Sequence, residues 1–220
     1  MSPLKITAHL YNGFVSRFPW SPSIDGILAW VERRAALGEE AFTAQQQDMS
    51  AQTPNENLPL EKIHDGELWW YACSNPIYET PFVSQRFVHK RFNMPEAEVF
   101  TDIGKIETTK GPMKNYRILY EMRVTDHIDW HVIGDADAIR DLLRSVSAIG
   151  GKLGAGYGRV KSWTVTDDGD EHLALFHRPL PVDYARRVGI DGLNLVWGIR
   201  PPIRLPENQV LCIIPDAESQ

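Results

Sequence analysis

The sequence predicts an α+β fold with a ferredoxin-like, split β-α-β core. Strand-like and helix-like patterns follow one another as strand, helix, strand, and this order occurs twice. A charged, turn-rich segment separates the two halves, and 43% of the 220 residues are hydrophobic, enough for one packed core. We expect residues 1–166 to form this domain and residues 167–220 to form a Pro-rich C-terminal extension packed on it.

The first half begins with a strand and a helix. Residues 4–11, LKITAHLY, alternate between apolar and polar side chains, which is typical of a half-buried strand. Apolar residues from Ile24 to Ala35 recur at helical spacing, and Gly38 can end that helix. The apolar aromatic run LWWYACS at residues 68–74 suits a buried strand.

An inserted hairpin is expected next. Residues 83–92 and 115–124 are strand-like, and Gly104, Gly111 and Pro112 lie in the charged segment between them. The run VSQRFVHKRF carries cations on both faces of its strand, which argues against burial of the strand on both sides. The segment 84–123 is therefore predicted to project as a thumb.

The second half repeats the pattern. A strand is predicted at residues 127–133, followed by a helix that Asp135 or Asp137 can cap. Its apolar stripe runs from Ile139 to Ile149, and we expect Gly150-Gly151 to end it. A strand at residues 159–166 completes the core, and one further strand-like run lies at residues 208–214.

Charge is distributed unevenly along the chain. The net charge of −6 argues against a nucleic-acid binder when the chain is taken as a whole. However, residues 84–123 hold 8 Lys+Arg against 5 Asp+Glu, and residues 140–163 hold 5 against 1. These two basic islands coincide with the predicted thumb and with a glycine-rich segment.

Five glycines occur in the nine residues 150–158, GGKLGAGYG. A dinucleotide site needs the glycines between a strand and a helix, and here the order is reversed. A P-loop needs Ser or Thr after Gly-Lys, and Leu153 stands there. Two interpretations stay open: a loop that lets a nucleic-acid backbone approach closely, and a tight structural connection.

The stretch GGKLGAGYGRVKSW, placed between an amphipathic helix and a strand, resembles the C-terminal glycine-rich loop of the RAMP superfamily of CRISPR-Cas proteins. The N-terminal strand followed by PSIDGILAWV is similar to the start of these proteins. Residues 4–37 and 127–166 carry the resemblance. The overall layout most resembles the small RAMP subunit of type IV effector complexes, which caps the five-prime handle of the CRISPR RNA.

The resemblance implies an RRM-related fold and a non-catalytic subunit of a type IV ribonucleoprotein, with CRISPR RNA, target DNA and other effector subunits as partners. It implies that the glycine loop binds the five-prime handle and that the thumb contacts nucleic acid and the neighbouring backbone subunit. The implied RNA-binding residues are Gly150, Gly151, Lys152, Gly154, Gly156, Tyr157, Gly158, Arg159 and Lys161 in and after the loop, and Arg86, Lys90, Arg91, Phe92, Lys110, Lys114, Arg117 and Arg123 in the thumb.

The alternative function is a metal-independent endoribonuclease that processes CRISPR RNA. A histidine can serve as the general acid or base of such a reaction, and His89 lies among the thumb cations. A lone histidine is more often structural. The sequence contains no Cys/His metal motif, so we expect no metal and no cofactor.

The compartment is predicted from simple features. The sequence contains no apolar run of the roughly 18 to 20 residues that cross a bilayer and no signal-peptide pattern. Two cysteines, Cys73 and Cys212, make no disulfide framework. We therefore expect a cytoplasmic protein with no membrane partner.

Overall fold

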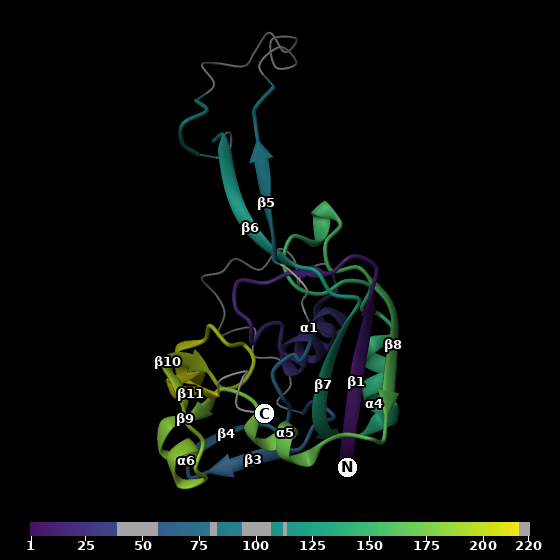
Figure 1. Cartoon of the computed structure of the whole chain (residues 1–220), viewed down its shortest axis with the longest axis vertical. Helices are drawn as coiled ribbons and strands as arrows, with labels where there is room; N and C mark the ends of the chain where they lie inside the picture. The colour runs from purple at the N-terminus through teal and green to yellow at the C-terminus, as the bar shows by residue number, and fades with distance from the viewer. Residues whose placement is uncertain (39–56, 80–82, 94–106, 112–113, 216–220) are drawn as a thin grey trace.

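The computed structural model describes residues 1–38, 57–79, 83–93, 107–111 and 114–215. Helices and strands are mixed along this chain, so the predicted α+β class is confirmed. In Figure 1 a long hairpin projects from a body that contains the remaining labelled elements.

The centre of the body is an antiparallel sheet with the strand order β7-β1-β8. It consists of β1 (Ser2–Leu10), β7 (His127–Gly134) and β8 (Val160–Thr166). Alternate residues of β1, from Leu4 to Leu10, are buried, which confirms the period-two pattern of the sequence. The opposite face is polar, and there Thr7 donates a hydrogen bond of 2.5 Å to Asp129.

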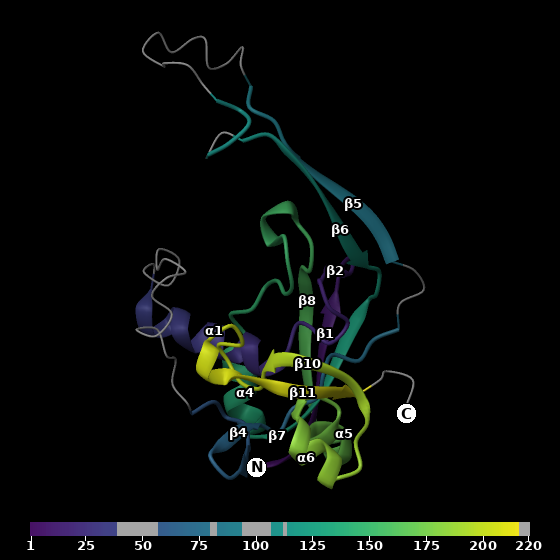
Figure 2. The same ribbon diagram turned by 90° about the vertical axis from the view of Figure 1, so that its left-hand side faces the viewer.

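Two helices cover the apolar face of this sheet (Figure 2). Helix α1 (Ile24–Leu37) ends as predicted at Gly38, whose N–H bonds to the carbonyl of Arg34. Helix α4 (Ala136–Leu143) is capped by Asp135, whose carboxylate accepts from two backbone N–H groups at 3.0 Å. The fully buried side chains between sheet and helices include Ile6, Leu28, Ile128, Trp130, Ile139 and Leu143.

The prediction that α4 continues to Ile149 is wrong. The helix ends at Leu143, and the hydroxyl of Ser145 bonds to the carbonyl of Leu142 in place of a further helical turn. Beyond it, Ala148 pairs with Arg159 as an isolated antiparallel bridge. Val146 and Ile149 are buried even so, which explains why they extended the apolar stripe of the sequence.

A small hairpin lies at the β7 edge of the central sheet. It is formed by β3 (Lys62–Asp65) and β4 (Leu68–Tyr71), the latter within the predicted strand at 68–74. The chain then continues along β7, because Cys73 bridges Val132 and Ile77 bridges Asp129, both antiparallel. This segment therefore occupies the position next to β7 and away from β1.

The projecting hairpin is formed by β5 (Val83–Lys90) and β6 (Tyr116–Arg123), which pair along their whole length. We call these two strands the thumb (Figure 1). At its root, β6 also pairs with the short strand β2 (Phe14–Val15). Residues 94–106 and 112–113 of the predicted thumb lie outside the described residues.

The C-terminal residues contain more structure than the single strand expected. They form α5 (Glu171–Phe176), β9 (Leu180–Pro181), α6 (Val182–Arg187), β10 (Gly192–Gly198), a 3-10 turn (Pro206–Asn208) and β11 (Gln209–Pro215). The strand order is β10-β11-β9. This unit packs against Trp70 of β4, which is fully buried. The division of the chain at residue 166 stays a prediction.

A buried arginine joins the C-terminal unit to the rest of the body. The Arg178 guanidinium donates to the carbonyls of Tyr71 and Ile199, the latter at 2.7 Å, and lies 3.5 Å from the buried Asp25 carboxylate of α1. It also contacts the sulfur of Cys73 at 3.0 Å, where burial raises the pKa of the thiol to about 12. Three chain segments are therefore fixed by one side chain.

Candidate functional site

The glycine segment (residues 150–158) forms a loop that projects beside the root of the thumb (Figure 2). The bridge between Ala148 and Arg159 closes its base. On its inner side, Gly151 bridges Val15 of β2, and its N–H donates to the Val15 carbonyl at 2.7 Å. The glycine segment therefore lies against β2, which pairs with β6 at the root of the thumb.

Some of the five glycines are required by the fold itself. Gly150 and Gly158 have φ angles of +82° and +66°, which L side chains rarely adopt. A Cβ on Gly150 would lie 2.7 Å from the Val15 carbonyl oxygen, and one on Gly158 would collide with the Ile149 carbonyl. The structural interpretation of the segment therefore holds for these two positions.

The tip of the segment is different. Gly154 lies in a short 3-10 turn, Leu153–Ala155, and a Cβ placed on it would meet no described heavy atom within 4 Å. Gly156 is equally open, although its φ of +86° disfavours other residues. Open backbone at these two positions leaves room for a ligand to approach closely.

Lys152 connects the glycine segment to the thumb. It has left-handed backbone angles, φ 59° and ψ 38°, which are uncommon outside glycine. Its Nζ lies 4.5 Å from the centre of the Tyr120 ring, and a hydrogen bond to Tyr120 raises the pKa of Lys152. The ammonium group is therefore held at the junction of the loop and β6.

One face of the thumb carries cations and aromatic rings in register. Arg86 is paired with Tyr120 and Lys90 with Tyr116, and Ile118 lies between them on the same face of β6. We call this the basic face. Because Ile118 and Tyr120 also border a cleft beside the glycine segment, the basic face leads toward Lys152.

The opposite face of the thumb is more apolar. Phe87 pairs with Leu119, and His89 pairs with Arg117. The Arg117 guanidinium lies 3.8 Å from the centre of the Phe87 ring, so this cation stacks on a neighbour within the thumb. His89, the candidate general acid or base, therefore lies on the face away from the basic face.

The remaining thumb candidates lie at different places. Arg91 and Phe92 follow β5, and the Phe92 N–H donates to the Asn115 side chain at 2.7 Å. Lys110 forms an exposed ion pair of 3.4 Å with Glu107, and Lys114 is exposed just before β6.

Arg123, one of the thumb residues that the resemblance implies for RNA binding, lies buried instead. Arg123 is 7% exposed, and its guanidinium donates to the Ser16 carbonyl at 2.7 Å. It lies in the last position of β6, paired with Phe14, where the thumb enters the body. Arg123 thus anchors the thumb root.

The second basic island divides between two surfaces. Tyr157 is half-buried and Arg159 is exposed at the end of the glycine segment. Lys161 lines a separate groove of about 500 Å³, together with Arg140 and Arg144 of the α4 region. The structure therefore brings Lys152 to the thumb and places Lys161 elsewhere.

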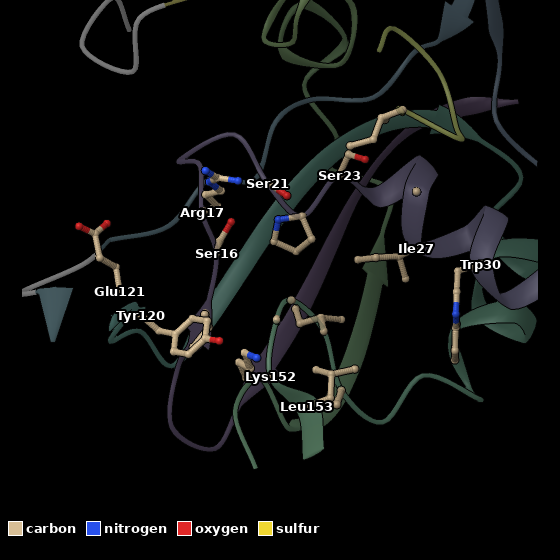
Figure 3. A pocket seen from close by; sticks show the side chains of 18 of the residues that line it. Ser16, Arg17, Ser21, Ser23, Ile27, Trp30, Tyr120, Glu121, Lys152 and Leu153 are labelled. Atoms are coloured by element: carbon tan, nitrogen blue, oxygen red, sulfur yellow. The ribbon is translucent and has the colours of Figure 1, made fainter. Parts of the chain in front are cut away.

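A large cleft lies where the thumb root, the glycine segment and α1 meet (Figure 3). Its volume is about 930 Å³. Figure 3 shows Tyr120 and Lys152 on one side and Ile27 and Trp30 of α1 on the other. Sequence reasoning missed this cleft and the residues Arg17, Trp30 and Tyr120, because the segments that form it are far apart in the chain.

Two further observations bear on the expected chemistry. The described side chains include no group of three or more His, Cys, Asp or Glu placed to hold a metal ion. Every helix in the described ranges is too short or too polar to reach across a lipid bilayer.

Comparison with protein families gives a match over nearly the whole chain. The family model described as CRISPR type IV associated protein Csf3 matches residues 2–215. A search of curated proteins finds no match to the chain.

Proposed function

Because the chain belongs to the family of CRISPR type IV associated protein Csf3, we propose that it is the RNA-binding subunit of a type IV effector ribonucleoprotein and that it binds the five-prime handle of the CRISPR RNA. Family membership makes it a type IV CRISPR subunit. The RNA-binding role rests on the arrangement of the thumb and the glycine segment.

One observation carries the proposal: Lys152 of the second basic island lies against the basic thumb, so cations from two parts of an acidic chain meet at one surface. The basic face of the thumb leads to Lys152 and then to the open tip at Gly154. Cations attract phosphates, aromatic rings accept stacked bases, and open glycine backbone admits a nucleic-acid strand. These three features favour single-stranded RNA over a protein partner at this surface.

The strand order supports the ferredoxin-like part of the proposal. In chain order, the four segments of the body sheet are β1, the segment that bridges β7 at Cys73 and Ile77, β7 itself, and β8. Their spatial order places this bridging segment and β8 at the two edges, with α1 and α4 on one face. We infer a split β-α-β core, related to RRM folds, that presents the glycine segment before its last strand.

A single exposed glycine offers the sharpest test. Gly154→Asp places a carboxylate at the open tip, and Asn194→Asp adds the same charge to exposed β10 in the C-terminal unit. We expect Gly154→Asp to weaken binding of a repeat-derived RNA at least tenfold, because the carboxylate repels phosphate, and Asn194→Asp to leave it unchanged. Equal affinities for the two variants, with folding verified by circular dichroism, would refute this site.

We propose a non-catalytic role, with target DNA as a further partner during interference. No described contact of His89 favours the endoribonuclease alternative. The centre of its ring lies 6.4 Å from that of the Phe87 ring, on the thumb face away from Lys152. Incubation of labelled repeat RNA with the chain in EDTA separates the two functions. Specific cleavage that disappears in His89→Ala would replace the proposed role with processing.

A further inference from the structure

The cleft has two aromatic walls. Tyr120 of β6 forms part of the thumb side, and Trp30 of α1 forms part of the opposite side. Trp30 is 43% exposed, although the six other tryptophans are all less accessible, and the Arg34 guanidinium lies 5.4 Å from the centre of its ring. A tryptophan this accessible contributes less to the core than Trp130, which is fully buried.

The rest of the lining combines apolar surface with a few polar groups. Ile27, Ile118 and Leu153 supply apolar side chains, while Ser21 and Ser23 supply hydroxyls that can act as donor or acceptor. Lys152 and Arg17 contribute positive charge, against the one lining carboxylate, Glu121, which Figure 3 shows turned toward the outside. Apolar walls with few convergent polar groups are typical of sites for flat organic ligands.

We propose that this cleft binds unstacked bases of the single-stranded RNA whose phosphates follow the basic face of the thumb and Lys152. The inference rests on the proposed function and adds that the bases of the RNA occupy the cleft while its phosphates stay on the basic face. Bases are flat, apolar on their faces and polar at their edges, and proteins hold unpaired bases by stacking them on aromatic rings. A volume of about 930 Å³ lies near the upper end of the range for ligand sites, so the cleft holds at least one nucleotide.

The position of the cations favours a base over an apolar protein segment. Lys152 lies between the basic face and the cleft, with its Nζ against Tyr120. An RNA strand that presents its bases to the cleft therefore brings its phosphates to the ammonium group of Lys152. An apolar peptide would leave Lys152 and Arg17 beside groups that do not balance their charge, which costs binding free energy.

The test places a fluorescent base at one position of a synthetic RNA at a time. The probe is a single-stranded RNA of the CRISPR repeat sequence carrying 2-aminopurine, whose fluorescence is quenched when it stacks on an aromatic ring. We expect quenching by the full-length chain at one position or a few adjacent positions. Tyr120→Leu and Trp30→Leu, from opposite walls, should each relieve it and weaken binding about tenfold, as expected for the loss of one stacked base.

Phe87→Leu is the matched control, because it removes an exposed aromatic ring from the thumb face away from the cleft. It should change neither the quenching nor the affinity. RNA that binds without position-specific quenching, or with quenching unchanged in Trp30→Leu, would overturn the cleft proposal and leave the RNA-binding function standing. Absence of RNA binding by the folded chain would overturn both.

Discussion

The body and the thumb use apolar side chains in opposite ways. In the body, Trp130 and Leu28 are fully buried, and they pack the sheet onto its helices. In the thumb, Phe87, Leu119 and Ile118 are each exposed by more than two fifths. Apolar side chains left in water add little to stability, so the body specifies the fold, while the thumb leaves apolar surface accessible. Substitutions in the two regions should therefore have different consequences.

The largest effect is expected in the body, at Arg178. Arg178→Met removes the guanidinium that links Tyr71, Ile199 and Asp25, and leaves the Asp25 carboxylate buried without its cation. We expect the free energy of unfolding to fall by about 3–5 kcal/mol, as when one partner of a buried ion pair is removed. Urea unfolding followed by tryptophan fluorescence measures it.

The matched control is Arg186→Met on the exposed side of α6, which should change the unfolding free energy by less than about 0.5 kcal/mol. If both arginine variants unfold at the same urea concentration, the buried guanidinium does not hold the body together in the way described.

Two glycines of one loop sharpen the comparison. Gly158→Ala forces a Cβ into a backbone at φ +66° and against the Ile149 carbonyl, and we expect a loss of stability of at least about 1–2 kcal/mol. Gly154→Ala meets no described neighbour, and we expect it to be neutral or stabilising by a few tenths of a kcal/mol. Thermal unfolding separates them; equal melting temperatures would contradict the assignment of a structural base and an open tip.

A smaller effect is expected on the thumb, and it should appear in binding rather than in stability. Arg86→Gln removes one cation from the basic face without removing a buried group. The slope of log affinity for repeat RNA against log salt should become shallower by about 0.7, the value for one contact to a single-stranded phosphate. Arg186→Gln should leave the slope unchanged, and the same shift in both variants would show that net charge alone is responsible.

The smallest effect concerns acid stability of the body. Burial and the positive charge of Lys5 lower the pKa of His131. Burial and the charge of His131 lower the pKa of His177. The folded state therefore binds protons at these two histidines less readily than the unfolded state does. Their contribution to the free energy of unfolding should be fully present above pH 6.5 and should decline as the pH falls below it. The carboxylates of Asp170 and Asp129 act on His131 in the opposite direction and limit the effect. Unfolding curves at pH 7.5 and pH 5.5 measure it, and greater stability at the lower pH would contradict this sign.

The sequence predicted the elements whose pattern is local. The alternation through Leu4, Ile6 and Ala8 identified β1, and the helical spacing up to Gly38 identified α1. Two strand-like runs, the first with cations on both faces, identified the thumb. The family resemblance grouped the glycine segment with the thumb, and of the second basic island the structure brings Lys152 to the thumb.

The sequence did not predict features that depend on contacts between distant segments. In the sequence Arg123 is indistinguishable from exposed thumb cations such as Arg117, and its burial depends on the contact with Ser16 at the root of the thumb. The apolar stripe of the sequence continues to Ile149, but α4 ends at Leu143 and Ala148 pairs with the more distant Arg159. The cleft and the buried Arg178 are assembled from several segments, so no single stretch carries a signal for either.

Photocrosslinking tests the central claim most directly. Repeat RNA with 4-thiouridine at single positions is irradiated with the full-length chain, and the crosslinked peptides are identified by mass spectrometry. If single-stranded RNA follows the basic face to the glycine segment, crosslinks should fall in residues 116–120 and 150–157. Crosslinks confined to β10 and β11, at residues 192–215, would contradict the account, because the RNA would then bind the C-terminal unit.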